Sequence, residues 1–65
     1  MKPSVGRIVH LNSGGICWAA IVTQVLDPES GRVQLTVFPP NITPYPQRAV
    51  ERGSAGGEWH WPERD

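Results

Sequence analysis

The sequence contains a single cysteine, no excess charge of either sign and no long apolar run, and each of these absences excludes a class of protein. Cys17 has no second cysteine with which to form an internal disulfide or to begin a zinc knuckle. Six Lys and Arg residues balance six Asp and Glu residues, so the chain lacks the positive charge through which proteins bind duplex nucleic acid. We therefore expect no duplex nucleic-acid partner.

No segment approaches the roughly 20 apolar residues of a membrane-spanning helix. Residues 1–7 contain no apolar run of signal-peptide length. The free thiol suits a reducing compartment. These features predict a soluble intracellular protein without a membrane partner.

The chain is long enough for one domain, 1–65, and for a small core only, because a domain of this size buries only about 60% of the surface that its unfolded chain exposes. Chains this short usually gain stability from disulfides, a metal or a second subunit. A disulfide is excluded, and the three tryptophans and low charge favour self-association.

Alternation and turn residues predict three consecutive strands. Residues 6–11 are a short β-branched run that ends at a mobile loop, 12–15. Residues 16–26 form the longest apolar stretch, and their β-branched side chains favour a central strand over a helix. The proline and glycine of segment 27–31 predict a hairpin turn. Residues 32–38, which follow it, alternate strictly and predict the partner strand.

The segment 39–57 has a different character, because its four prolines oppose both strand ladders and helices. Within it, residues 46–52 have room for at most a turn or two of helix. Residues 58–61 alternate and predict a last strand that reaches back across this long loop. The whole pattern predicts an all-β fold, a small four- to five-stranded antiparallel SH3-like barrel with one long Pro/Gly-rich loop.

The last predicted strand concentrates aromatic side chains. A period of two sends Trp59 and Trp61 to one face and His60 to the other. The indoles either fill the core or a subunit interface, or form a stacking platform for a planar ligand such as a base. Both roles hold if the ligand is trapped between copies of the chain.

The two histidines and the cysteine raise the question of a metal or acid–base site. His10, Cys17 and His60 come from three separate segments without a short ligand spacing, so we predict no metal site and no catalytic residue. A histidine in a strand is more often a hydrogen-bonded structural residue. Cys17 lies beside Trp18 in an apolar setting, so we expect a buried, inert thiol.

Arginine side chains suit phosphate or carboxylate groups, and Arg48 follows Tyr45 in the proline-rich segment. We expect no cofactor. The candidate ligand-binding residues are the aromatic, histidine and arginine side chains that the strands bring to the surface: Arg7, His10, Trp18, Tyr45, Arg48, Trp59, His60 and Trp61.

Three segments carry a resemblance to known proteins: 5–10 (VGRIVH), 19–25 (AAIVTQV) and 57–63 (GEWHWPE). Together they resemble a group of small uncharacterised proteins encoded by bacteriophages and actinobacterial prophages. The resemblance spans nearly the whole chain and is loosest over 39–57. It implies a phage context, and with it the cytoplasm of an infected or lysogenic bacterial host.

A second resemblance is to the plasmid-borne trimethoprim-resistant dihydrofolate reductases, very short SH3-like barrels that form a pore as tetramers. The glycine-led first strand and the small residues Ala19 and Ala20 are similar. The pore-lining motif of that family is not recognisable in this sequence.

These observations favour a non-enzymatic phage-type binding protein. We expect a homo-oligomer that sequesters a small anionic ligand, such as a nucleotide defence signal, or that blocks a host protein. One alternative is a minor virion protein with a structural or protein-interaction role. Another is a small oligomeric reductase similar to the plasmid-borne enzymes.

Overall fold

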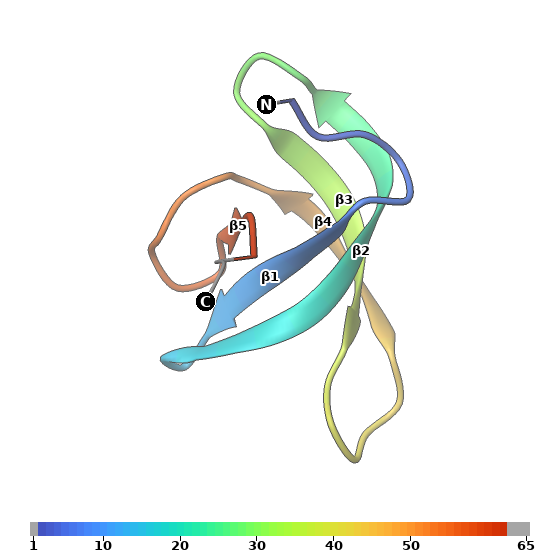
Figure 1. The fold of residues 1–65 in the computed structure, drawn as a ribbon, viewed down its shortest axis with the longest axis vertical. Coiled ribbons are helices and arrows are strands. Elements are labelled where there is room, and N and C mark those ends of the chain that lie inside the picture. The colour runs from blue at the N-terminus through green and yellow to red at the C-terminus, as the bar shows by residue number, and fades with distance from the viewer. Residues whose placement is uncertain (1, 63–65) are drawn as a thin grey trace.

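The computed structural model describes residues 2–62 and is all-β, as predicted. It contains five strands: β1 (Ile8–Ser13), β2 (Ile16–Asp27), β3 (Arg32–Phe38), β4 (Tyr45–Val50) and β5 (Trp59–His60). They form one antiparallel sheet in the order β4-β3-β2-β1-β5 (Figure 1). Within the described part of the chain, no helix is long and apolar enough to cross a membrane.

Strands β1, β2 and β3 form the predicted meander. β3 has the predicted bounds, and β2 extends one residue further than predicted. β1 begins at Ile8 and includes Asn12 and Ser13, which the sequence predicts to lie in a mobile loop. Instead, Gly14 and Gly15 form a two-residue turn with Ser13 paired to Ile16. Both glycines have positive φ, 60° and 81°, which is the backbone that a tight hairpin turn requires and that glycine adopts without strain.

The prediction for segment 39–57 is wrong in its middle. Residues 45–50 form β4, which pairs with β3, and the turn of helix considered for 46–52 is absent. Pro46 is tolerated because β4 is an edge strand, where a missing N–H need not interrupt a ladder on both sides. A register shift opposite β3 and the positive φ of Ala49, 53°, mark a bulge. Loops remain on both sides of β4, at 39–44 and at 51–58 (Figure 1).

The last strand pairs with the first, as predicted. Trp59 lies opposite Leu11, and His60 lies opposite His10. On its other side, the N–H of Trp59 donates to the Glu51 carbonyl at 3.0 Å, and its carbonyl accepts from the N–H of Gly53 at 2.9 Å. The small antiparallel sheet is consistent with an SH3-like barrel. However, β5 meets the chain that follows β4 through a single parallel bridge, so no continuous ladder closes the described sheet into a barrel.

One face of the curved sheet holds the core. Its buried side chains alternate along the strands, as period-two geometry requires: Val9, Leu11, Ala20, Val22, Val33, Leu35, Val37, Val50 and Trp59. Trp59 is the largest of them and is fully buried. Its indole N–H donates to the Gly31 carbonyl at 2.7 Å. Trp59 is therefore a core residue, one of the two roles predicted for the indoles.

Gly31 gives a first testable prediction. Its φ is +84°, and an added Cβ would lie 2.9 Å from the Cβ of Arg52. We expect Gly31→Ala to lower the free energy of unfolding by about 2 kcal/mol in urea titration, through backbone strain and the clash together. Gly15→Ala is the matched control, because Gly15 has a φ of +81° with nothing within 4 Å of the added Cβ. It should cost only about 1 kcal/mol, and equal losses would contradict the clash.

Candidate functional site

The sheet register brings three metal- and proton-binding side chains together on the face opposite the core. In β1, Val9 and Leu11 are buried, so His10 between them points to the other face. His10 is paired directly with His60 on β5. On β2 it is paired with Ala19, and Cys17 lies two residues from Ala19 on the same face. The small Ala19 side chain leaves space beside the imidazole.

The three side chains are close enough to act as one group. The Sγ of Cys17 lies 3.6 Å from Nε2 of His60. The His10 and His60 rings are 5.4 Å apart in an edge-to-face arrangement. One ligand atom from each of His10, Cys17 and His60 falls within 4.8 Å of the others. The spacing along the sequence did not indicate this convergence, which depends on strand pairing.

Cys17 differs from its prediction. The thiol was expected to be buried and inert, but Cys17 is exposed. The reason is its parity in β2, where Ala20 and Val22 face the core and odd-numbered residues before them face outward. Its sulfur donates weakly to Oδ1 of Asn12 at 3.5 Å, the residue paired with it across the hairpin.

The backbone of Asn12 fixes this region. Its N–H donates to the Glu58 carbonyl at 2.9 Å, and its carbonyl accepts from the N–H of Gly57 at 2.7 Å. These two bonds extend the β1–β5 pairing to the residues before β5. The orientation of His60 is therefore held by backbone contacts on both sides of the short strand.

A shallow hollow of about 370 Å³ lies beside the group. Its walls are formed by the end of β1, the start of β2, the loop after β4 and the last strand, through Asn12, Cys17, Ser54, His60 and Trp61. Four of these side chains offer polar hydrogen-bonding atoms in addition to the Cys17 thiol. The volume falls in the lower part of the range of small-molecule sites, about 300–1,000 Å³.

Trp61 forms the aromatic wall of the hollow. Its ring packs edge-to-face on Trp59, with centroids 5.2 Å apart. The guanidinium carbon of Arg7 lies 5.3 Å from the centroid of the Trp61 ring, a distance that permits a cation–π interaction. The indole Nε1 of Trp61 is buried and has no hydrogen-bond partner among the described residues. A buried donor of this kind is unfavourable unless something accepts its proton.

The other predicted ligand-binding residues lie elsewhere. Tyr45 and Arg48 are exposed on β4, the opposite edge strand in the pairing order from β5. Trp18 is half-buried and packs against the core, and Trp59 lies wholly within the core. The predicted ligand-binding residues therefore fall into two groups. Arg7, His10, His60 and Trp61 lie close to one another, through the Arg7–Trp61 and His10–His60 contacts and the hollow that His60 and Trp61 line.

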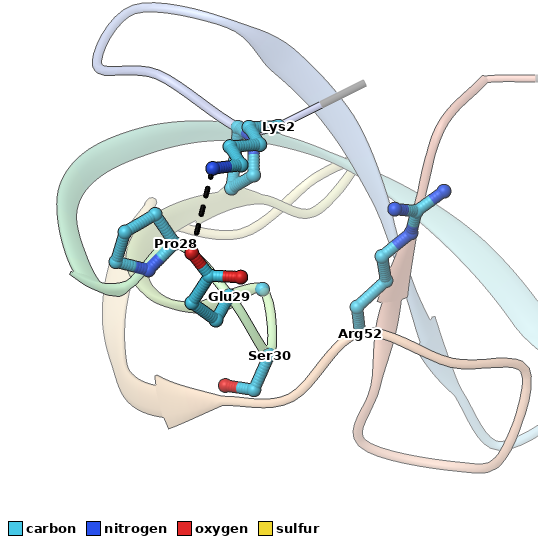
Figure 2. A pocket seen from close by; sticks show the side chains of 7 residues that line it. Lys2, Pro28, Glu29, Ser30 and Arg52 are labelled. Carbon is cyan, nitrogen blue, oxygen red and sulfur yellow. Dashed lines mark ion pairs between the residues drawn. The ribbon is translucent and has the colours of Figure 1, made fainter.

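A second hollow of about 140 Å³ lies between the N-terminal segment and the β2–β3 turn (Figure 2). Lys2 and Glu29 on its rim form an exposed ion pair at 3.5 Å. Figure 2 shows the Arg52 side chain directed away from this pair. Arg52 lies 5.7 Å from the Trp59 ring centroid. The ion pair links the first residues to the turn, and Arg52 contacts the core residue Trp59, so we interpret the hollow as structural.

A separate charge pair lies at the start of β3, between Arg32 and Glu51. The side-chain hydrogen bond from Nε of Arg32 to the Glu51 carboxylate, reinforced by charge attraction, raises the pKa of Arg32. Both side chains are partly exposed, so the pair contributes little to stability. It connects β3 to the residues after β4 and lies outside the candidate site.

No protein-family model, curated protein or solved structure matches the chain. The resemblances to phage proteins and to the plasmid-borne reductases therefore stay predictions.

Proposed function

We propose that this protein is a small non-enzymatic binding protein of SH3-like topology whose ligand occupies the hollow beside β5. The observation that carries the proposal is Trp61, which lines the hollow and whose buried indole Nε1 has no acceptor in the described chain. A ligand with an acceptor atom would satisfy this donor.

The chemistry of the walls favours a planar, anionic ligand such as a nucleotide. A base offers ring-nitrogen and carbonyl acceptors to the Trp61 indole. The amide of Asn12 and the hydroxyl of Ser54 can both donate and accept hydrogen bonds along the edge of a base. The guanidinium of Arg7 packs over the ring of Trp61, which lines the hollow, and a guanidinium suits phosphate.

The resemblance to phage proteins supplies a biological context for this proposal. A protein of this kind would act in the cytoplasm of an infected or lysogenic host, where it would sequester a nucleotide defence signal. The proposal that the protein binds a ligand is based on the hollow and its polar walls.

Isothermal titration calorimetry against a panel of cyclic and linear nucleotides tests the proposal. We expect at least one nucleotide to bind, and Trp61→Phe to weaken that nucleotide at least about tenfold, because the substitution keeps the ring and removes the N–H. Trp18→Phe is the matched control, since Nε1 of Trp18 is also buried without a partner in the described structure but lies outside the hollow. No heat with any nucleotide, or equal losses in the two variants, would contradict the proposal.

A second candidate function is docking on another protein, either a virion component or a host factor. Apolar side chains on the outer face favour it, because Ile8 is 60% exposed and Phe38 is 41% exposed. Phe38 pairs with Ala19 on β2. Ile8 pairs with Ile21, which lies two residues further along β2 and on the same face. Purified phage particles that contain the protein stoichiometrically would support docking over ligand sequestration.

The same exposed side chains support the proposal of self-association. Contact between two outer faces would cover Ile8 and Phe38 and add the buried apolar area that a short chain lacks. We expect light scattering at micromolar concentration to give a dimer or a larger oligomer. A monomer under these conditions would contradict the proposal.

A further inference from the structure

We propose that His10, Cys17 and His60 bind one Zn²⁺ ion on the outer face of β1, β2 and β5, with one coordination position open to the hollow. This site goes beyond the proposed function. The metal would bind whether or not a nucleotide occupies the hollow, so the two activities can be measured separately.

The geometry is close to that of a tetrahedral site. Zinc bonds of about 2.3 Å to sulfur and about 2.0–2.1 Å to nitrogen place the two ligand atoms about 3.6 Å apart at tetrahedral angles. The observed distance from Cys17 Sγ to His60 Nε2 is 3.6 Å. The three ligand atoms all lie within 4.8 Å of one another. Rotation of the half-buried His10 ring about its side-chain bonds would bring it into range.

The ligand set selects the class of metal. Imidazole and thiolate groups suit Zn²⁺ and related first-row transition metals, whereas Mg²⁺ and Ca²⁺ take oxygen ligands. No carboxylate is part of the cluster in the described chain. A single thiolate leaves a net charge of +1 on the bound metal group. That charge favours a water-derived hydroxide or an anion at the open position.

The surroundings support a metal-bound thiolate. The side-chain amide of Asn12 lies beside Sγ, with Oδ1 at 3.5 Å. Metal binding would displace the thiol proton of Cys17. Rotation of the Asn12 amide would then direct its N–H₂ group to the sulfur, so that the amide donates a hydrogen bond to the thiolate. Outer contacts of this kind orient metal ligands. The open position would face the hollow, since Cys17 and His60 belong to both.

The backbone positions of the three ligand residues are fixed before a metal arrives. They lie on three strands that are hydrogen-bonded neighbours in one sheet, β2, β1 and β5. His10 is paired directly with His60. A site built on strands needs little backbone rearrangement on binding, which favours affinity. In the sequence, by contrast, position 17 lies 7 residues after position 10 and 43 residues before position 60. Spacing along the chain therefore does not indicate the site.

Calorimetry with Zn²⁺ on the reduced and chelator-treated 65-residue chain tests the site. We expect one Zn²⁺ per chain, and at least a 100-fold loss of affinity in Cys17→Ser and in His60→Asn, since each removes one of three ligands. Thr36→Ala is the control on the same face, because Thr36 lies between the buried Leu35 and Val37 of β3. This variant should bind Zn²⁺ as the wild type does. Unchanged affinity in Cys17→Ser, or one Zn²⁺ shared by two chains, would overturn the proposal.

Two further measurements keep the result interpretable. Circular dichroism should show that Cys17→Ser folds, because Cys17 is exposed and serine is of similar size. Co²⁺ should give a thiolate-to-metal charge-transfer absorption in the wild type and not in Cys17→Ser, and absence of that band in the wild type would overturn the site. Nucleotide titrations with and without Zn²⁺ separate the proposals: zinc binding without nucleotide binding refutes the proposed function alone, and the reverse refutes the metal site alone.

Discussion

Replacement of Trp59 by alanine should leave most of the protein unfolded at 25 °C. Trp59 is fully buried and is the largest side chain of the core. Truncation of a buried Trp to Ala costs about 3–5 kcal/mol. A domain below about 70–80 residues rarely obtains more than about 3–5 kcal/mol from its core. The expected result is loss of the strand signal in circular dichroism without added denaturant.

Two further variants show which property of Trp59 matters. Trp59→Phe keeps most of the buried ring but removes the N–H that donates to the Gly31 carbonyl at 2.7 Å, and it should cost about 1–3 kcal/mol through that unpaired carbonyl. Trp61→Ala should cost less than Trp59→Ala, because Trp61 is only half-buried. If Trp61→Ala were the more destabilising change, Trp59 would not be the centre of the core.

Zinc should raise the stability of the native protein strongly. A ligand that binds only the folded state at 100 times its dissociation constant adds about 2.7 kcal/mol to the free energy of unfolding. For a domain of this size, this corresponds to a rise in Tm of about 10–20 °C. The physical reason is that the metal would link three strands, including β5, which is only two residues long.

Thermal unfolding with Zn²⁺, with Mg²⁺ and with a chelator measures this effect. Mg²⁺ should give no shift, because nitrogen and sulfur ligands do not suit it. Cys17→Ser should lose the zinc shift while it keeps the metal-free Tm. Acidification should remove the shift as well, because metal binding requires that the ligands release their protons. A zinc shift that persists in Cys17→Ser would place the metal elsewhere.

The sequence predicted the fold class and the meander well, because those features depend on local patterns. Strict alternation in residues 32–38 identified β3 with its observed bounds. The prediction did not identify β4, because Pro46 argues against a strand unless that strand is known to lie at an edge. Edge position is a property of the assembled sheet, which local sequence does not contain.

The candidate site was predictable only in part. The sequence indicated Arg7, His60 and Trp61 as functional residues, and they lie beside one hollow or over its wall. The convergence of His10 with Cys17 depends on the β1–β2 register, which the two-residue turn at Gly14 and Gly15 sets. Recognition of that turn would have placed both side chains on one face and predicted an exposed thiol.

X-ray absorption spectroscopy of the zinc-loaded protein tests the central claim most directly, namely that three neighbouring strands present His10, Cys17 and His60 as one ligand group. The predicted first shell contains one sulfur at about 2.3 Å and two imidazole nitrogens at about 2.0–2.1 Å, with one light atom at the open position. A shell of oxygen and nitrogen alone, or one with two sulfurs from two chains, would contradict this account.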